Sequence, residues 1–310
     1  MSNALAQLAT TGHVRAHFGP YPTEEPFILR IPADRTLRLQ PTNGPTPLGD
    51  HVFTRGQIQV GQTLQHLVNL KTEAALARDD GANEEASALS ARLSRFEDGL
   101  QTLFDDPDTR LAFDRRALSF ALHSRGKSTS FEHLPDGLSS ATYIWSGLTL
   151  AWEGQRRKGD FAGRGWALLD EPELHLHAEL QKKLLPFLVA SFPNVQFIVA
   201  THSPAILASL RGATIFDLRT REAYPSEELR GVRYGTILTE HFGISSDFDL
   251  QTTRALEQLY ALYDSSPKPG SAQFSQFKEM RMLAESLGDV PHVLVSAAGK
   301  LTSRASDSDD

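Results

Sequence analysis

The chain has 310 residues, of which 40% are hydrophobic, enough for one or two domains with a proper core. Its net charge of −7 argues against general coating of nucleic acid, although a local basic patch is compatible with it. The absence of cysteine excludes disulfides and thiolate metal sites. No apolar run of about twenty residues could form a transmembrane helix, and the first residues lack the charged start and apolar core of a signal peptide. These features predict a soluble cytoplasmic protein without a membrane partner.

The first half of the chain divides into a β-rich piece and a helical segment. Residues 1–52 are rich in turn-forming residues, with Phe27–Ile31 as the clear strand candidate and Arg35–Leu39 as a second. Apolar spacing then predicts helices from Phe53 to Arg115, broken at Asp79–Asn83. This helical hairpin either only completes the fold or docks a partner protein.

Gly126–Thr129 reads GKST, which invites comparison with a phosphate-binding loop. However, Ala121 stands where the pattern requires its earlier glycine, and the residues after Ser130 do not start a helix. A phosphate-binding loop needs its amides at a helix N-terminus. We therefore interpret GKST as a hairpin turn after a short strand at Ser119–His123, and Ala298–Lys300 fails for the same reasons.

The stretch Leu134–Ala141, LPDGLSSA, precedes a helix that is expected to reach about Trp152. By itself it reads as a turn and a helix cap. The amide of Gly137 and the helix dipole nevertheless suit an anion.

Trp166–Leu210 predicts an alternation of strands and helices. Trp166–Leu169 reads as a buried strand that ends on Asp170 and Glu171, and Leu174–Ser191 has helical spacing. Val195–Ala200 is a second buried strand, which delivers Thr201–Pro204 at its end. Strand, helix, strand and helix in this order predict a parallel sheet with right-handed crossovers, whose carboxyl edge collects the polar residues.

Asp170, Glu171 and His202 at this edge suit nucleotide hydrolysis. Asp170 would hold a magnesium ion, Glu171 would activate water, and His202 would contact the terminal phosphate. A lone Asp-Glu pair after an apolar run is more often a strand end entering solvent. The Thr-His-Ser-Pro sequence at the end of the next strand reverses that preference.

The motifs resemble a known family. LLDEPELHLH resembles the Walker B motif and D-loop of ABC-class ATPases, and VATHSP resembles their H-loop. The variant found here is similar to SMC-like ATPases of prokaryotic antiphage defence, namely the Septu-type, retron-associated and overcoming-lysogenisation-defect ATPases, over roughly Phe53–Leu259. The resemblance implies an α/β fold with an ABC-ATPase head-like parallel sheet flanked by helices. It divides the chain into an N-terminal β-rich remnant (1–52), a helical insertion (53–117), an ATPase core (118–265) and a C-terminal extension with a disordered acidic tail (266–310).

The same resemblance implies a dimer or higher oligomer that closes around ATP and Mg²⁺. The residues in the place of the ABC signature would cap the partner's nucleotide: Pro135, Asp136, Gly137 and Ser139. Pro135 replaces the family's usual serine and so removes a hydroxyl and an amide donor. His175, in the D-loop, would pack across the dimer and not bind a metal. The implied effector is an HNH-type nuclease, or a reverse transcriptase with its nucleic acid.

One expected part of such an ATPase is missing. No G-x-x-x-x-G-K-[ST] loop occurs anywhere in the sequence, so the N-terminal Walker A part of the family is expected to be lacking. The chain is then either an ATPase whose phosphate loop is supplied elsewhere or a catalytically incomplete scaffold or sensor. The sequence leaves both open. A serine hydrolase is disfavoured because the G-x-S-x-G elbow is absent.

Overall fold

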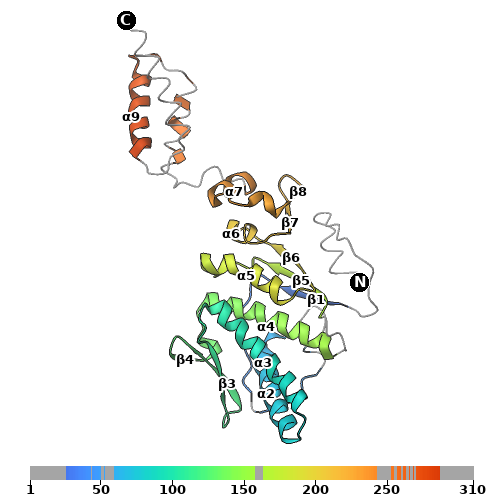
Figure 1. Ribbon diagram of the computed structural model, residues 1–310. Helices are drawn as coiled ribbons and strands as arrows, with labels where there is room; N and C mark the ends of the chain where they lie inside the picture. Colours follow the sequence, from blue (N-terminus) through green and yellow to red (C-terminus); the bar gives the residue numbers. More distant parts are fainter. Residues whose placement is uncertain are drawn as a thin grey trace. The chain divides into compact units, whose positions relative to one another are not determined.

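The computed structural model describes residues 26–157 and 163–242, apart from gaps at 43, 50–51 and 53–58, and shorter stretches between 253 and 286 (Figure 1). The chain forms two compact units. The first comprises Met1–Phe216 and Ala223–Arg230, and the second comprises Asp217–Glu222 and Gly231–Asp310. The domain limits expected at residues 52, 117 and 265 stay a prediction.

A three-stranded parallel sheet with the order β1-β5-β6 forms the centre of the first unit (Figure 1). Its strands are β1 (Phe27–Ile31), β5 (Gly165–Asp170) and β6 (Val195–Ala200). Ile31 lies opposite Leu169, and Asp170 lies opposite Ala200, so the carboxyl ends of the strands meet at one edge. The predicted α/β fold with a parallel sheet and flanking helices is confirmed.

Two helices and an aromatic cluster cover the sheet. α4 (Asp136–Arg157) packs on β1, and α5 (Ala178–Ser191) connects β5 to β6. The fully buried Trp145 of α4 donates its indole N–H to the carbonyl of Phe96 over 3.2 Å. A Cβ at Gly99 would lie 2.2 Å from this ring, so only glycine lets the indole pack here. Phe187 and Phe192 complete the aromatic cluster, with ring centroids 5.1 Å and 5.3 Å from that of Trp145.

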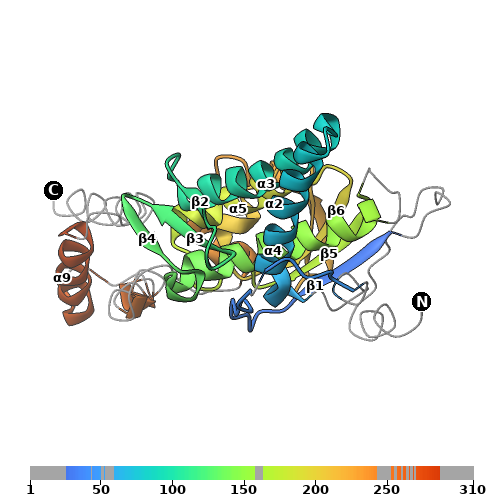
Figure 2. The same ribbon diagram turned by 90° about the horizontal axis from the view of Figure 1, so that it is seen from below.

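The predicted helical hairpin is α2 (Thr63–Asp79) and α3 (Asn83–Phe104), which pack against each other (Figure 2). The interval from Phe53 to Arg115 is not helical to its end, however. It ends in β2 (Arg110–Asp114), which pairs antiparallel with β3 (Ser119–Ser124). Asp105 takes a left-handed conformation, with φ of 50°, and so ends α3 before this strand.

Arg35–Leu39 is not a strand, contrary to expectation. Arg35, Leu37 and Leu39 are buried and the residues between them are exposed, so the segment has the alternating burial of a strand. No neighbouring strand pairs with this segment in the described part of the chain, and it therefore stays an extended loop.

Two helix boundaries also differ from the sequence reading. α5 begins at Ala178 and not at Leu174, because the side chain of His177 caps it by accepting the amide of Leu180 over 3.3 Å. α4 continues past Trp152 to Arg157.

The described residues contain further helices and strands. They are β4 (Lys127–Thr129), α6 (Pro204–Leu207), β7 (Thr214–Asp217), β8 (Glu222–Pro225), α7 (Tyr234–His241), α9 (Ala272–Ser286) and the 3-10 turns Val60–Gln62, Phe131–His133 and Ser226–Leu229. Ala298–Lys300 and the predicted acidic tail lie outside the described residues. Within the residues that are described, no helix has the length and apolar character needed to cross a membrane.

Candidate functional site

The ends of β5 and β6 bring the predicted polar residues to one edge of the sheet. Asp170 is the last residue of β5 and is exposed. Glu171 follows it with a left-handed backbone (φ of 44°), and its amide donates to the carbonyl of Ala200 over 2.9 Å. The turn Thr201–Ser203 follows β6 and leads into α6, whose first residue is Pro204, as predicted. These groups therefore lie at the carboxyl edge of the sheet, as the sequence predicted.

Glu171 and His202 are in contact. Their Oε1 and Nε2 atoms are 3.4 Å apart, and the imidazole is 83% exposed while the carboxylate is 24% exposed. Burial raises the pKa of Glu171, and the carboxyl of Glu173 raises it further through a hydrogen bond and like-charge repulsion, whereas His202 opposes both effects. A carboxylate with a raised pKa is a better proton acceptor than an ordinary surface glutamate. The pair can therefore orient and deprotonate a water molecule.

Glu173 is a contributor that the sequence reading did not include in the site. Its Oε1 accepts the hydroxyl of Thr201 over 2.6 Å and the amide of His202 over 2.8 Å. These bonds join the loop after β5 to the turn after β6 and fix the backbone that carries His202. The acidic residue two positions after Glu171 was the available sequence signal.

Arg35 is the second contributor that the sequence reading missed. Its side chain is buried, and its Nε donates to the hydroxyl of Ser140 over 2.7 Å. Burial lowers the pKa of the guanidinium, and the carboxylates of Glu173, Asp170 and Glu171 oppose that effect. An arginine at an inward position of an alternating apolar pattern was the signal. The guanidinium also donates to the carbonyls of Pro32 (3.1 Å), Ala33 (3.4 Å), Asp170 (3.2 Å), Glu171 (3.1 Å) and Pro172 (2.9 Å).

The predicted signature residues lie in and just before the first turn of α4, next to the loop after β5. A Cβ at Gly137 would lie 2.6 Å from the carbonyl oxygen of His175, so these two predicted residues are in close backbone contact. Pro135 and Asp136 are exposed and Ser139 is half-buried. Ser139 donates its amide to the carbonyl of Pro135 over 2.8 Å, inside the helix turn. The structure thus joins the start of α4 to the segment that follows the carboxylates.

The exposed carboxylate of Asp170 is a group that could contact a metal ion. Among the described residues, no group of three or more His, Cys, Asp or Glu side chains could hold a metal ion by itself. In nucleotide sites Mg²⁺ takes one or two carboxylates and completes its shell with phosphate oxygens and water. The exposed carboxylate of Asp170 fits that use. The Nδ1 atom of His177 is engaged as the cap of α5, where it accepts the amide of Leu180.

GKST lies in a hairpin, as interpreted from the sequence. Arg125 and Gly126 form the turn between β3 and β4, both with left-handed backbones. The carboxylate of Asp106 accepts the amide of Arg125 over 2.8 Å and the hydroxyl of Ser124 over 2.6 Å. The turn amide therefore binds a carboxylate of the protein, not a phosphate.

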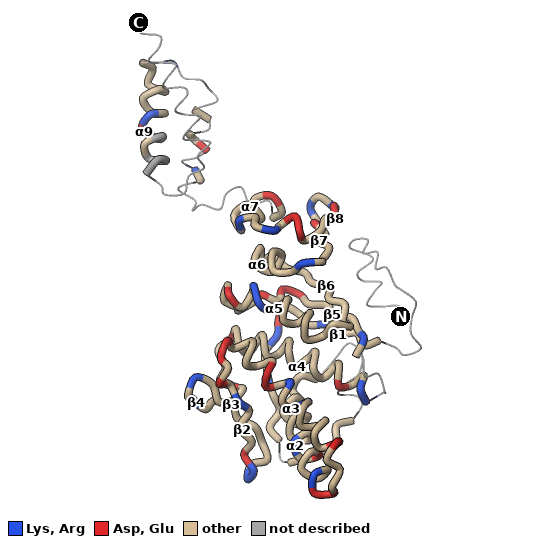
Figure 3. The backbone as a smooth tube through the Cα atoms, in the orientation of Figure 1, with Lys and Arg blue, Asp and Glu red and all other residues tan. Residues whose placement is uncertain are grey.

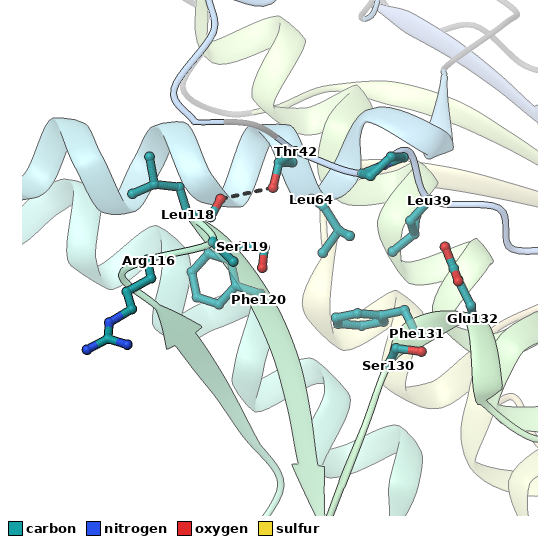
Figure 4. A pocket seen from close by; sticks show the side chains of 12 residues that line it. Leu39, Thr42, Leu64, Arg116, Leu118, Ser119, Phe120, Ser130, Phe131 and Glu132 are labelled. Atoms are coloured by element: carbon teal, nitrogen blue, oxygen red, sulfur yellow. Dashed lines mark hydrogen bonds between the residues drawn. The ribbon is translucent and has the colours of Figure 1, made fainter.

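A pocket of about 570 Å³ lies elsewhere in the first unit (Figure 4). Leu39, Leu64, Phe120 and Phe131 form apolar parts of its lining. None of the predicted site residues lines it, so it is separate from the carboxylate site.

Comparisons with known proteins assign the chain to a family. The chain matches a family model described as AAA domain, putative AbiEii toxin, Type IV TA system, over residues 49–208. The chain belongs to this family. Septu protein PtuA from Bacillus mycoides (strain KBAB4) is 27% identical over 162 residues, 49% of this chain and 22% of PtuA. Retron Vc95 probable ATPase from Vibrio cholerae serotype O1 biovar El Tor is 24% identical over 208 residues, 64% of this chain and 40% of that protein.

This AAA-domain chain therefore resembles Septu and retron proteins, as its motifs predicted. The matched regions span 22% and 40% of the lengths of the two relatives. Among solved structures, the crystal structure of the SmcHead bound to the C-winged helix domain of ScpA matches with a TM-score of 0.33 and 16% identity. That match covers 48% of this chain and 45% of the SmcHead chain.

Proposed function

We propose that this chain is an ABC-class ATPase subunit that dimerises around ATP and Mg²⁺ and gates a partner effector in antiphage defence. The contact between Glu171 and His202, 3.4 Å apart beside the exposed Asp170, carries the proposal. Parallel sheets bind their ligands at the carboxyl ends of the strands, where these groups lie.

Each residue has a distinct task in this proposal. Asp170 would hold Mg²⁺, and the bound ion would supply charge neutralisation at the phosphates. Glu171 would orient the attacking water and accept its proton. His202, exposed at the end of β6, would hydrogen-bond the terminal phosphate and keep Glu171 in place.

We infer the dimer from exposed residues near the site and the effector from the similarity to known proteins. Pro135, Asp136, Gly137 and Ser139 at the start of α4 would face the partner's nucleotide, and the loop around His175 would pack across the dimer. Leu174, in that loop, is 37% exposed, which suits a contact with a second copy. The similarity to a Septu protein and a retron ATPase supports an HNH-type nuclease, or a reverse transcriptase with its nucleic acid, as the effector.

Charge distribution favours a protein effector over direct binding of nucleic acid by this chain. Over the described residues, positive and negative positions are interspersed along helices and loops instead of forming one broad basic field (Figure 3). With a net charge of −7, tight non-specific binding of a phosphate backbone is not expected.

A second candidate function is a catalytically incomplete scaffold or sensor. The observation in its favour is the GKST hairpin, whose turn amide is bound to Asp106. Without a phosphate loop, carboxylates alone repel a nucleotide unless Mg²⁺ or another chain offsets them.

Nucleotide binding and hydrolysis by the purified chain separate the two candidates. In the ATPase, Glu171→Gln keeps Mg²⁺-dependent ATP binding and lowers kcat about 100-fold or more, whereas Asp170→Asn weakens the Mg²⁺-dependent part of binding. Glu179→Gln is the matched control, since Glu179 is an exposed glutamate of α5. This variant should have the activity of the parent. Hydrolysis that continues unchanged in Glu171→Gln would refute the assigned base. Absence of ATP binding at millimolar concentration would favour the scaffold.

A further inference from the structure

Arg35 links parts of the first unit that are far apart in the sequence. It follows β1 on an extended loop, yet its donors reach carbonyls 135 to 137 residues away and a hydroxyl 105 residues away. The acceptors belong to the end of β5, the loop after it and the first turns of α4. No other described contact joins these places through a single charged side chain.

The chemistry of the contact requires a guanidinium. Arginine presents five N–H donors in a rigid planar fork. All three nitrogens of Arg35 are used, with Nε on Ser140 and the terminal nitrogens on the carbonyls of Asp170, Glu171 and Pro172. The compact ammonium of a lysine cannot span these acceptors, because its donors all radiate from a single nitrogen atom.

The loop from Asp170 to His175 has backbone conformations that must be stabilised by other contacts. Glu171 and His175 both have left-handed backbones, with φ of 44° and 67°. Such conformations are unfavourable for residues other than glycine, and they persist where surrounding contacts impose them. Arg35 supplies three such contacts at Asp170–Pro172, and the close approach of Gly137 to His175 supplies another.

We propose that Arg35 is a positioning residue that fixes the backbone of Asp170–Pro172 against the start of α4, so that the two move as one unit. The consequence for hydrolysis rests on the proposed function. The carboxylates of one nucleotide site and the first turn of α4, which would face the partner's nucleotide, then shift together when the dimer closes. Arg35 touches neither nucleotide in this arrangement.

Hydrogen exchange in the full-length chain tests the proposal without requiring activity. The amides of Glu171, Leu174 and Leu176 report on the segment, since each is bonded to a carbonyl, at 2.9, 3.1 and 2.8 Å. We expect Arg35→Ala and Arg35→Lys to speed exchange at these amides about tenfold or more, with β1 and α3 unchanged. Guanidinium at millimolar concentration, far below denaturing levels, should restore protection in Arg35→Ala alone.

Arg38→Ala is the matched control, because Arg38 is an exposed arginine of the same loop and its loss should leave every amide unchanged. Wild-type protection in Arg35→Lys would overturn the proposal, because a single charge would then suffice. Acceleration spread evenly over the first unit would overturn it as well, because Arg35 would then be only a core residue. If Arg35→Ala does not fold, Ser140→Ala removes one acceptor alone and should speed exchange of the Ser139 amide in α4.

The kinetics of ATP hydrolysis provide a second, separate test. In an active chain, Arg35→Lys should lower kcat and leave KM for ATP unchanged, since in the proposed arrangement the side chain would not contact nucleotide. If the parent chain hydrolyses no ATP, the proposed function fails, while the exchange data still decide the role of Arg35.

Discussion

Glu171 is surrounded by contacts that come from several parts of the chain. Its backbone is left-handed, its side chain is half-buried, and its pKa is raised by burial and by Glu173. Arg35 binds the carbonyl of Glu171, while Glu173 fixes the amide of His202 opposite it. The conformational cost is offset by side chains from separate parts of the chain, which is typical of residues with a functional task.

Gly137 should not tolerate a side chain. A Cβ there would meet the backbone carbonyl oxygen of His175 at 2.6 Å, which cannot rotate away. We expect Gly137→Ala to lower the free energy of unfolding by about 1–3 kcal/mol, measured by denaturant titration. Gly147→Ala in the same helix is the control, because its Cβ would find ordinary contacts at 3.7 Å. It should be neutral or stabilise by up to about 1 kcal/mol. Equal effects of the two substitutions would contradict the close contact.

His66 of α2 should make stability depend on pH. Burial lowers its pKa to about 4, and this outweighs the attraction of Glu153, whose carboxylate already pairs with Arg92. The folded state binds a proton at His66 less well than the unfolded chain does. The contribution of neutral His66 to the free energy of unfolding is therefore fully present above its ordinary pKa of about 6.5. It is lost as the pH falls from there to about 4, by on the order of 3 kcal/mol.

Chemical denaturation at several pH values measures this contribution. His66→Gln retains every other titrating group, so its free energy of unfolding should fall less steeply than that of the parent between pH 6.5 and 4. Parallel curves for the two proteins would mean that His66 accepts a proton freely in the fold.

At the scale of elements, the β3–β4 hairpin contains letters of a phosphate-binding loop but does not have the structure of one. The letters GKST are present, but the turn is held by Asp106, whose pKa is lowered to about 2 by bonds from Ser124 and from the amide of Arg125. A phosphate loop needs a helix directly after the lysine, whereas β4 (Lys127–Thr129) follows here.

Lys127→Ala should therefore leave nucleotide binding unchanged. Lys127 is exposed on the hairpin and lies in no helix N-terminus. Titration with a fluorescent ATP analogue compares the variant with the parent, and Lys182→Ala on α5 serves as a control for loss of surface charge. Binding that disappears only in Lys127→Ala would show that the hairpin contacts phosphate.

At the scale of the whole molecule, ATP should drive self-association through the loop after β5. Leu174 is 37% exposed there, and burying the rest of its side chain in an interface contributes up to about 1 kcal/mol per copy. In a Glu171→Gln background, Mg²⁺ and ATP should produce dimers by sedimentation velocity. Leu174→Asp should weaken this association about tenfold or more. Leu76→Asp, at an exposed leucine of α2, should leave it intact. Nucleotide-dependent dimers in Leu174→Asp would exclude this loop from the interface.

Local pattern alone determined much of this protein. The apolar runs that became β1, β5 and β6, the hairpin of α2 and α3, and the reading of GKST as a turn were all predictable. So was the meeting of Asp170, Glu171 and His202 at one edge, because parallel strands share the direction of their carboxyl ends. Apolar periodicity and turn-forming residues act over a few positions, so they can be recognised in a single sequence.

Tertiary contacts decided the rest. Arg35–Leu39 has the alternation of a strand but no partner strand, and α5 begins later than its apolar spacing suggests because His177 caps it. Four of the partners of Arg35, Ser140 and Asp170–Pro172, lie more than a hundred residues away in the sequence. One of them is the carbonyl of Glu171, whose backbone is left-handed. No local pattern encodes which distant carbonyls a buried guanidinium will meet, because only the packed sheet and α4 bring them within hydrogen-bonding distance.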